Sequence, residues 1–169
     1  MTSRRRGRQF AVQMLYQHSF SAYEPEKVFD LFWRGVKTDD ATREFAETLV
    51  LGVLRVQSEL DMEITAYLKN WTLERIAVMD HLVLQLGFYE LIHEDDIPWK
   101  VVIDEAVSLA KMYSTEKSAT FINGVLHAWA TKNNLTDMTA EEAMSMRAAD
   151  YPEDDDYDDH DDRDDEDEA

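Results

Sequence analysis

The side chains with the clearest capacity for chemistry are four arginines near the N-terminus. They lie between Arg4 and Arg8, and no acidic residue precedes Glu24. Guanidinium groups bind phosphate bidentately, and a cationic terminal arm can wrap a flexible anionic strand. Tyr16 follows two turns into the adjoining helical segment, where its ring could stack on an unpaired base. The arginines therefore indicate either nucleic-acid binding or a solvated basic terminus, and by themselves they do not separate the two.

Two other groups of side chains have residue types that occur in metal sites and in catalytic pairs. His93-Glu94-Asp95-Asp96 is rich in ligand types, but adjacent residues rarely converge on one ion, and an EF-hand spacing is absent. Asp80-His81 could orient an imidazole for catalysis only if a partner approached from another element. The chain has no Cys, no serine elbow and no G-x-x-x-x-G-K motif. We therefore expect no enzyme, no metal and no cofactor.

The elements that must position these side chains are helical. Apolar residues recur at spacings of three and four from Thr42 to Asn70, which predicts one long helix or two nearly collinear ones. Leu73–Leu91 is apolar on most sides and predicts a buried central helix. Ser118 predicts the cap of the last helix. No strand-like alternation stands out, so the pattern favours an all-α bundle of about seven helices.

The charge of the chain is strongly segregated. Its 169 residues include 17 Lys+Arg and 36 Asp+Glu, a formal net charge of −19. Residues 137–169 contain 17 of the acids and two arginines, which places a net charge of −15 in this segment. Like charges at this density repel, and this predicts a disordered acidic tail. Residues 1–136 are nearly neutral, so the negative net charge of the whole chain does not exclude a nucleic-acid partner.

The composition also predicts domain organisation and location. Residues 1–136 are long enough to fold unaided as one helical domain, in which residues 1–9 form a flexible Arg-rich arm. No apolar run reaches the roughly 18–20 residues of a bilayer span, and no apolar signal core follows the arginines. We expect a soluble, cytoplasmic protein without a membrane partner.

Three stretches within residues 1–136 are specific in their combination and order, although each alone would be a weak signal. They are Arg5–Tyr16 (RRGRQFAVQMLY), Leu82–Leu91 (LVLQLGFYEL), and Val102–Lys111 (VIDEAVSLAK) followed by Phe121–Leu126 (FINGVL). Together they resemble the opening, central and closing helices of the NusB family of bacterial transcription antitermination factors. The resemblance runs from Arg4 to about Trp129 and implies an all-helical fold of two packed sub-bundles.

The resemblance also implies an activity and partners. Members of the family bind the boxA element of nascent RNA, notably of rRNA operons, as a heterodimer with NusE, a small-subunit ribosomal protein. The heterodimer helps assemble a complex on RNA polymerase that resists termination. The alternative is a helical protein–protein interaction module without RNA specificity. Apolar helix faces leave open whether the free protein is a monomer or a homodimer.

Site residues follow from the resemblance for two surfaces. The RNA-binding residues that it implies are Arg4, Arg5, Arg6, Arg8, Gln13, Tyr16, Lys117, Ser118 and Phe121. The residues that it places towards NusE are Tyr16, Asp80 and His81. Gln85 departs from the pattern, because the family usually has Arg at this position.

The acidic tail lies outside the family pattern, and its charge is opposite to that of the arginine arm. A tethered segment with a net charge of −15 could compete with RNA phosphates for the arm, most strongly at low salt. A tail that serves only solubility is the alternative.

Overall fold

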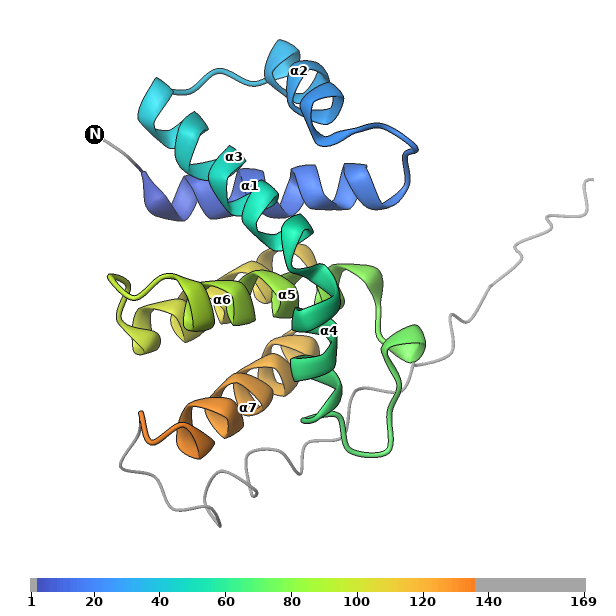
Figure 1. Ribbon diagram of the computed structural model, residues 1–169, viewed down its shortest axis with the longest axis vertical. Coiled ribbons are helices and arrows are strands. Elements are labelled where there is room, and N and C mark those ends of the chain that lie inside the picture. Colours follow the sequence, from blue (N-terminus) through green and yellow to red (C-terminus); the bar gives the residue numbers. More distant parts are fainter. Residues whose placement is uncertain (1–2, 136–169) are drawn as a thin grey trace, which may run out of the picture.

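A computed structural model of the protein describes residues 3–135 (Figure 1). Over this range the chain forms helices and no strand. The helices are α1 (Arg4–Ser19), α2 (Pro25–Gly35), α3 (Asp40–Arg55), α4 (Gln57–Thr65), the 3-10 helix η1 (Leu73–Arg75), α5 (Val78–His93), α6 (Trp99–Tyr113) and α7 (Glu116–Lys132). The prediction of an all-helical bundle of about seven helices is confirmed. The acidic segment 137–169, predicted to be disordered, lies outside the described residues.

The seven α-helices pack as two groups. Figure 1 shows α1, α2 and α3 in the upper half of the view and α4 to α7 in the lower half. α5 contacts α1 and α3 of the first group and α4, α6 and α7 of the second. Its residues from Leu82 to Glu90 are all buried, which confirms the prediction of a central helix. That helix begins at Val78 rather than Leu73, because η1 and an extended Ile76 precede it.

The periodic segment from Thr42 to Asn70 forms two helices. Val56 separates α3 from α4 with φ −114° and ψ 21°. The apolar stripe stays buried across this break, at Leu49, Val53, Leu60 and Ile64. The spacing therefore identified the inner face, and the backbone at Val56 divides the segment into two helices rather than one.

The cap of α7 differs from the prediction. The hydroxyl oxygen of Thr115 accepts a hydrogen bond from the backbone N–H of Ser118 at 2.9 Å, so Thr115 is the N-cap. Ser118 lies inside the first turn and is buried. The prediction that Ser118 is the cap is wrong, because the helix begins one turn earlier than the apolar pattern alone suggested.

Gly52 lets α3 lie directly against the ring of Tyr89 on α5. A Cβ at this position would overlap Cζ and Oη of Tyr89, a buried ring that also stacks on His93. We therefore expect Gly52→Ala to lower the free energy of unfolding by about 1–3 kcal/mol, measured by urea denaturation. The control is Gly35→Ala, since a Cβ there meets nothing within 4 Å. A Gly52→Ala protein as stable as the unchanged chain would contradict the close approach.

Candidate nucleic-acid and partner interface

The N-terminal arginines lie in the first turns of a helix. α1 begins at Arg4, and the Oγ of its cap residue Ser3 accepts a hydrogen bond from the backbone N–H of Arg6 at 3.4 Å. The backbone N–H of Ser3 donates to Oγ1 of Thr42 on α3 at 3.0 Å, which anchors the start of the helix. The prediction of a flexible arm over residues 1–9 is therefore wrong for the described residues 3–9. The cap and the contact with α3 order them.

Arg8 is buried and paired. Its side chain is 3% exposed, and that of Glu90 on α5 is 2% exposed. The Nε of Arg8 donates to both carboxylate oxygens of Glu90, at 2.9 and 3.0 Å, and the guanidinium lies over the ring of Phe45. Burial raises the pKa of Glu90, while the hydrogen bonds from Arg8 oppose that rise. The burial contradicts a direct RNA contact for Arg8, which instead ties α1 to α5.

The other three arginines reach the surface. The side chain of Arg5 is 69% exposed, and its Nη2 lies 2.9 Å from Oε1 of Glu105 on α6. The hydrogen bond from Arg5 to this carboxylate raises the pKa of Arg5. Arg4 lies 3.5 Å from Asp96, and the guanidinium of Arg6 lies over the ring of Phe10. The pair of Arg4 and Asp96 is exposed on both sides and therefore weak, so Arg4 can exchange Asp96 for phosphate. The carboxylate of Glu105 is only 12% exposed, but the guanidinium of Arg5 beside it stays open to solvent.

Two side-chain links hold α1 alongside α6. One is the pair of Arg5 and Glu105; in the other, Nε2 of Gln13 donates to Oη of Tyr113 at 2.6 Å. Both links join residues 100 apart in sequence, so the two helices run parallel and in register. The links are eight residues apart, or about 12 Å along the helix axis. We refer to Arg4, Arg5, Arg6, Gln13 and Tyr16 as the α1–α6 seam.

An exposed aromatic pair continues this seam. Tyr16 is 41% exposed and Phe20 is 66% exposed, and their ring centroids are 4.8 Å apart. Exposed aromatic rings beside cations are the usual platform for unpaired bases. Phe20 is absent from the predicted site residues, although its position four residues after Tyr16 indicates a shared helix face.

The first turn of α7 contributes one accessible cation. Lys117 is exposed, whereas Ser118 and Phe121 are only 3% and 7% exposed. The hydroxyl of Ser118 donates to Oδ2 of Asp80 on α5 at 2.7 Å. Asp80 is fully buried, so its interpretation as a surface docking residue is wrong. Asp80, Ser118 and Phe121 fix the start of α7, and through it the position of Lys117.

His81 and Gln85 both bind Asp61 on α4. The Nε2 of His81 lies 2.6 Å from Oδ1 of Asp61, and Nε2 of Gln85 donates to the same oxygen at 2.7 Å. Unlike Asp80, the side chain of His81 keeps 24% exposure and can reach a partner. Gln85 thus joins α5 to α4.

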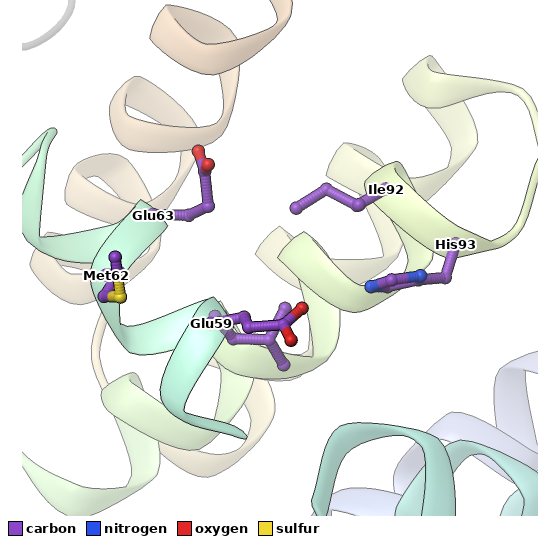
Figure 2. Close-up of a pocket in the computed structure, with 6 residues that line it drawn as sticks. Glu59, Met62, Glu63, Ile92 and His93 are labelled. Carbon is purple, nitrogen blue, oxygen red and sulfur yellow. The ribbon is translucent and has the colours of Figure 1, made fainter. Parts of the chain in front are cut away.

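A cleft of about 280 Å³ lies between α4 and the C-terminal end of α5. Figure 2 shows Glu59, Met62 and Glu63 on α4, and Ile92 and His93 on α5 across from them. The two carboxylates repel phosphate, so the cleft is not part of a nucleic-acid surface. Within residues 3–135, no three His, Asp or Glu side chains are grouped to hold a metal. No helix in this part of the chain is long and apolar enough to cross a bilayer.

The fold and the seam define an all-helical protein with an exposed surface of arginine and aromatic side chains, suited to a phosphate-bearing strand. The family model described as the NusB family matches residues 5–131. The chain belongs to the NusB family.

Relatives and solved structures agree with this assignment. The chain is 42% identical over 127 residues to the transcription antitermination protein NusB of Geobacter sulfurreducens, covering 75% of this chain and 92% of the relative. It is 42% identical over 123 residues to the protein of the same name from Bacillus velezensis, covering 73% and 92%. A T. maritima NusB structure superposes with a TM-score of 0.70 at 34% identity, covering 86% of this chain and 99% of that one. A structure described as the antitermination factors NusB and NusE in complex with dsRNA gives 0.68 at 29% identity, covering 76% and 96%.

Proposed function

We propose that this protein is a transcription antitermination factor that acts on nascent RNA in the cytoplasm. In this proposal it binds single-stranded boxA-type RNA, notably of rRNA transcripts, as a heterodimer with NusE, a small-subunit ribosomal protein. The heterodimer then joins an antitermination complex on RNA polymerase. The observation that carries the proposal is the α1–α6 seam, which presents three arginines and Tyr16 on α1, with the ring of Phe20 beside Tyr16 at the end of the helix.

The chemistry of the seam favours an unpaired RNA strand. Arg4, Arg5 and Arg6 supply guanidinium groups for phosphates at one end of α1. Tyr16 and Phe20 supply exposed rings at the other end, and such rings stack on bases only when the bases are not paired. Lys117 on α7 adds a further cation for the phosphate backbone.

In this proposal NusE contacts those residues that the resemblance places towards it and that are also exposed. Tyr16 and His81 are partly exposed and can contact a partner directly. Asp80 acts through Ser118, by holding α7 in place. The similar structure described as NusB and NusE with RNA supports this pairing, although its RNA is described as double-stranded. A duplex therefore belongs among the ligands tested.

The test is fluorescence anisotropy of a labelled single-stranded boxA-type RNA, with a scrambled strand and a boxA duplex as controls. We expect selective binding of the boxA strand that becomes tighter when NusE is added. Equal, weak binding of all three RNAs with and without NusE would contradict the proposal. The protein would then be the helical protein–protein interaction module of the alternative interpretation.

A further inference from the structure

A second cationic surface lies in the group formed by α4 to α7. The guanidinium of Arg75 lies 4.5 Å from the ring centroid of Trp71, and Nζ of Lys132 lies 5.7 Å from that of Tyr67. Lys69 is exposed between the two aromatic residues in the α4–α5 loop. We call Tyr67, Lys69, Trp71, Arg75 and Lys132 the cation–aromatic surface. Figure 1 shows its loop in the lower half of the molecule, away from the start of α1.

The cations of this surface have no carboxylate partner within residues 3–135. Lys69, Arg75 and Lys132 are all exposed, and none forms an ion pair with a described Asp or Glu. Glu74 is the one acidic residue between Ala66 and Ala77, so the surface keeps a net charge of +2. The arginines of α1 differ in this respect. Arg4, Arg5 and Arg8 already face Asp96, Glu105 and Glu90, respectively.

The chain leaves α7 beside this surface. Asn134 adopts a left-handed φ of 56°, and the backbone N–H of Leu135 donates to the carbonyl of Ala130 at 2.9 Å. The turn directs the chain back over the end of the helix that carries Lys132. Asp137, the first of the 17 acids in residues 137–169, follows two residues after Leu135. At about 3.3–3.6 Å per extended residue, the segment is long enough to reach every cation of the surface.

We propose that the acidic segment 137–169 binds in cis to the cation–aromatic surface. Attachment at Leu135 gives the segment a high effective concentration there, and its net charge of −15 complements three cations that pair with no carboxylate of residues 3–135. Two of the three arginines of the seam, Arg4 and Arg5, attract it less, because Asp96 and Glu105 partly neutralise their charges. The segment thereby shields this second cationic surface from RNA phosphates and leaves the α1–α6 seam open.

The test is zero-length carbodiimide cross-linking of the full-length protein, read by peptide mass spectrometry. The reagent joins a lysine amine to a carboxylate only when the two are in contact. We expect Lys69 to couple to acids of residues 137–169 several-fold more than Lys27 and Lys37, which are exposed on and after α2. Lys69 is the diagnostic residue, because Lys132 is close to the segment in sequence.

Three conservative variants place an amine at chosen arginine positions. Arg75→Lys keeps the charge and should gain cross-links to the segment, whereas Arg55→Lys, exposed at the end of α3, should not. Arg6→Lys reports on the alternative in which the segment covers the α1–α6 seam. Cross-links concentrated at Arg6→Lys, or spread evenly over all lysines, would overturn the proposal. Loss of the Lys69 cross-links on adding a short single-stranded RNA would assign the surface to nucleic acid and would also overturn it.

Discussion

Replacing Arg8 with methionine is expected to lower the free energy of unfolding by about 3–5 kcal/mol. The substitution leaves Glu90 in a site where its side chain is 2% exposed and where Arg8 is the cation that faces it. The neighbouring acids Glu94 and Glu105 already act to raise the pKa of Glu90, so they add to the cost of leaving its charge unpaired. Urea denaturation followed by far-ultraviolet circular dichroism measures the loss.

The same variant should show a defined pH dependence. A carboxyl whose folded pKa lies above its unfolded value binds more protons in the folded state, so its contribution to stability falls as the pH rises. Without Arg8 the folded pKa of Glu90 rises further. The stability difference between Arg8→Met and the unchanged protein should therefore shrink as the pH falls towards about 4.3, the unfolded pKa of Glu. If this stability difference stays constant from neutral pH down to pH about 4.3, Glu90 is not an unpaired charge in the variant.

Two further variants distinguish the loss of the ion pair between Arg8 and Glu90 from the loss of one positive charge. Arg6→Met removes the same charge at an exposed position and should change the free energy of unfolding by less than about 0.5 kcal/mol. The double variant Arg8→Met/Glu90→Leu should be more stable than Arg8→Met, because replacing both members of a buried pair with apolar side chains is often nearly neutral. If Arg8→Met costs less than about 1 kcal/mol, the pair does not hold α1 to α5.

The second large effect concerns the salt dependence of RNA binding. Changing Arg4, Arg5 and Arg6 together to serine should reduce the slope of log K against log salt by about 2, at about 0.7 per phosphate of a single strand. The corresponding loss of affinity is about a hundredfold at 0.1 M salt, if the loss vanishes on extrapolation to 1 M. Counting all four arginines from the sequence would give a slope of about −3. The burial of Arg8 removes one of these contacts.

The control for this triple variant carries the same change of charge elsewhere. Lys27, Arg34 and Arg55 are exposed on α2 and α3, and changing all three to serine should leave the salt slope nearly unchanged. Filter binding or anisotropy over a range of salt concentrations gives both slopes. An equal reduction in the two triple variants would mean that net charge, rather than the α1–α6 seam, governs binding.

Local information was enough to predict much of the fold. The apolar spacing of Leu49, Val53, Leu60 and Ile64 marks one buried face, and every one of these side chains is at most 1% exposed. Leu82 to Leu86 read as buried because no face of that segment is polar enough for solvent. The break at Val56 and the start of α7 at Glu116 were not predictable in this way, because caps and bends depend on one or two backbone hydrogen bonds.

The candidate site was predictable only as a set of residue types. The sequence placed the cations in an N-terminal arm and Tyr16 on the opening helix, and the resemblance added Gln13, Asp80 and Lys117. It did not reveal that Glu105 and Tyr113 hold α1 against α6, because both partners are 100 residues away from the side chains they bind. Nor did it reveal that Asp80 is a buried acceptor for Ser118.

The sequence by itself determined that this is an all-helical protein, that four of its arginines cluster near the N-terminus, and that 17 of its 36 acids lie in residues 137–169. These are properties of composition and spacing, and they follow from local chemistry. The tertiary structure alone decided which of the adjacent arginines are available to a ligand. Arg4 and Arg5 share a helix face with Arg8 but lie one turn earlier, at the exposed start of α1, whereas Arg8 reaches inward to Glu90 and Arg6 points away from it. The direction of the protein interior, and so the identity of the buried arginine, is set by α5, about eighty residues further along the chain.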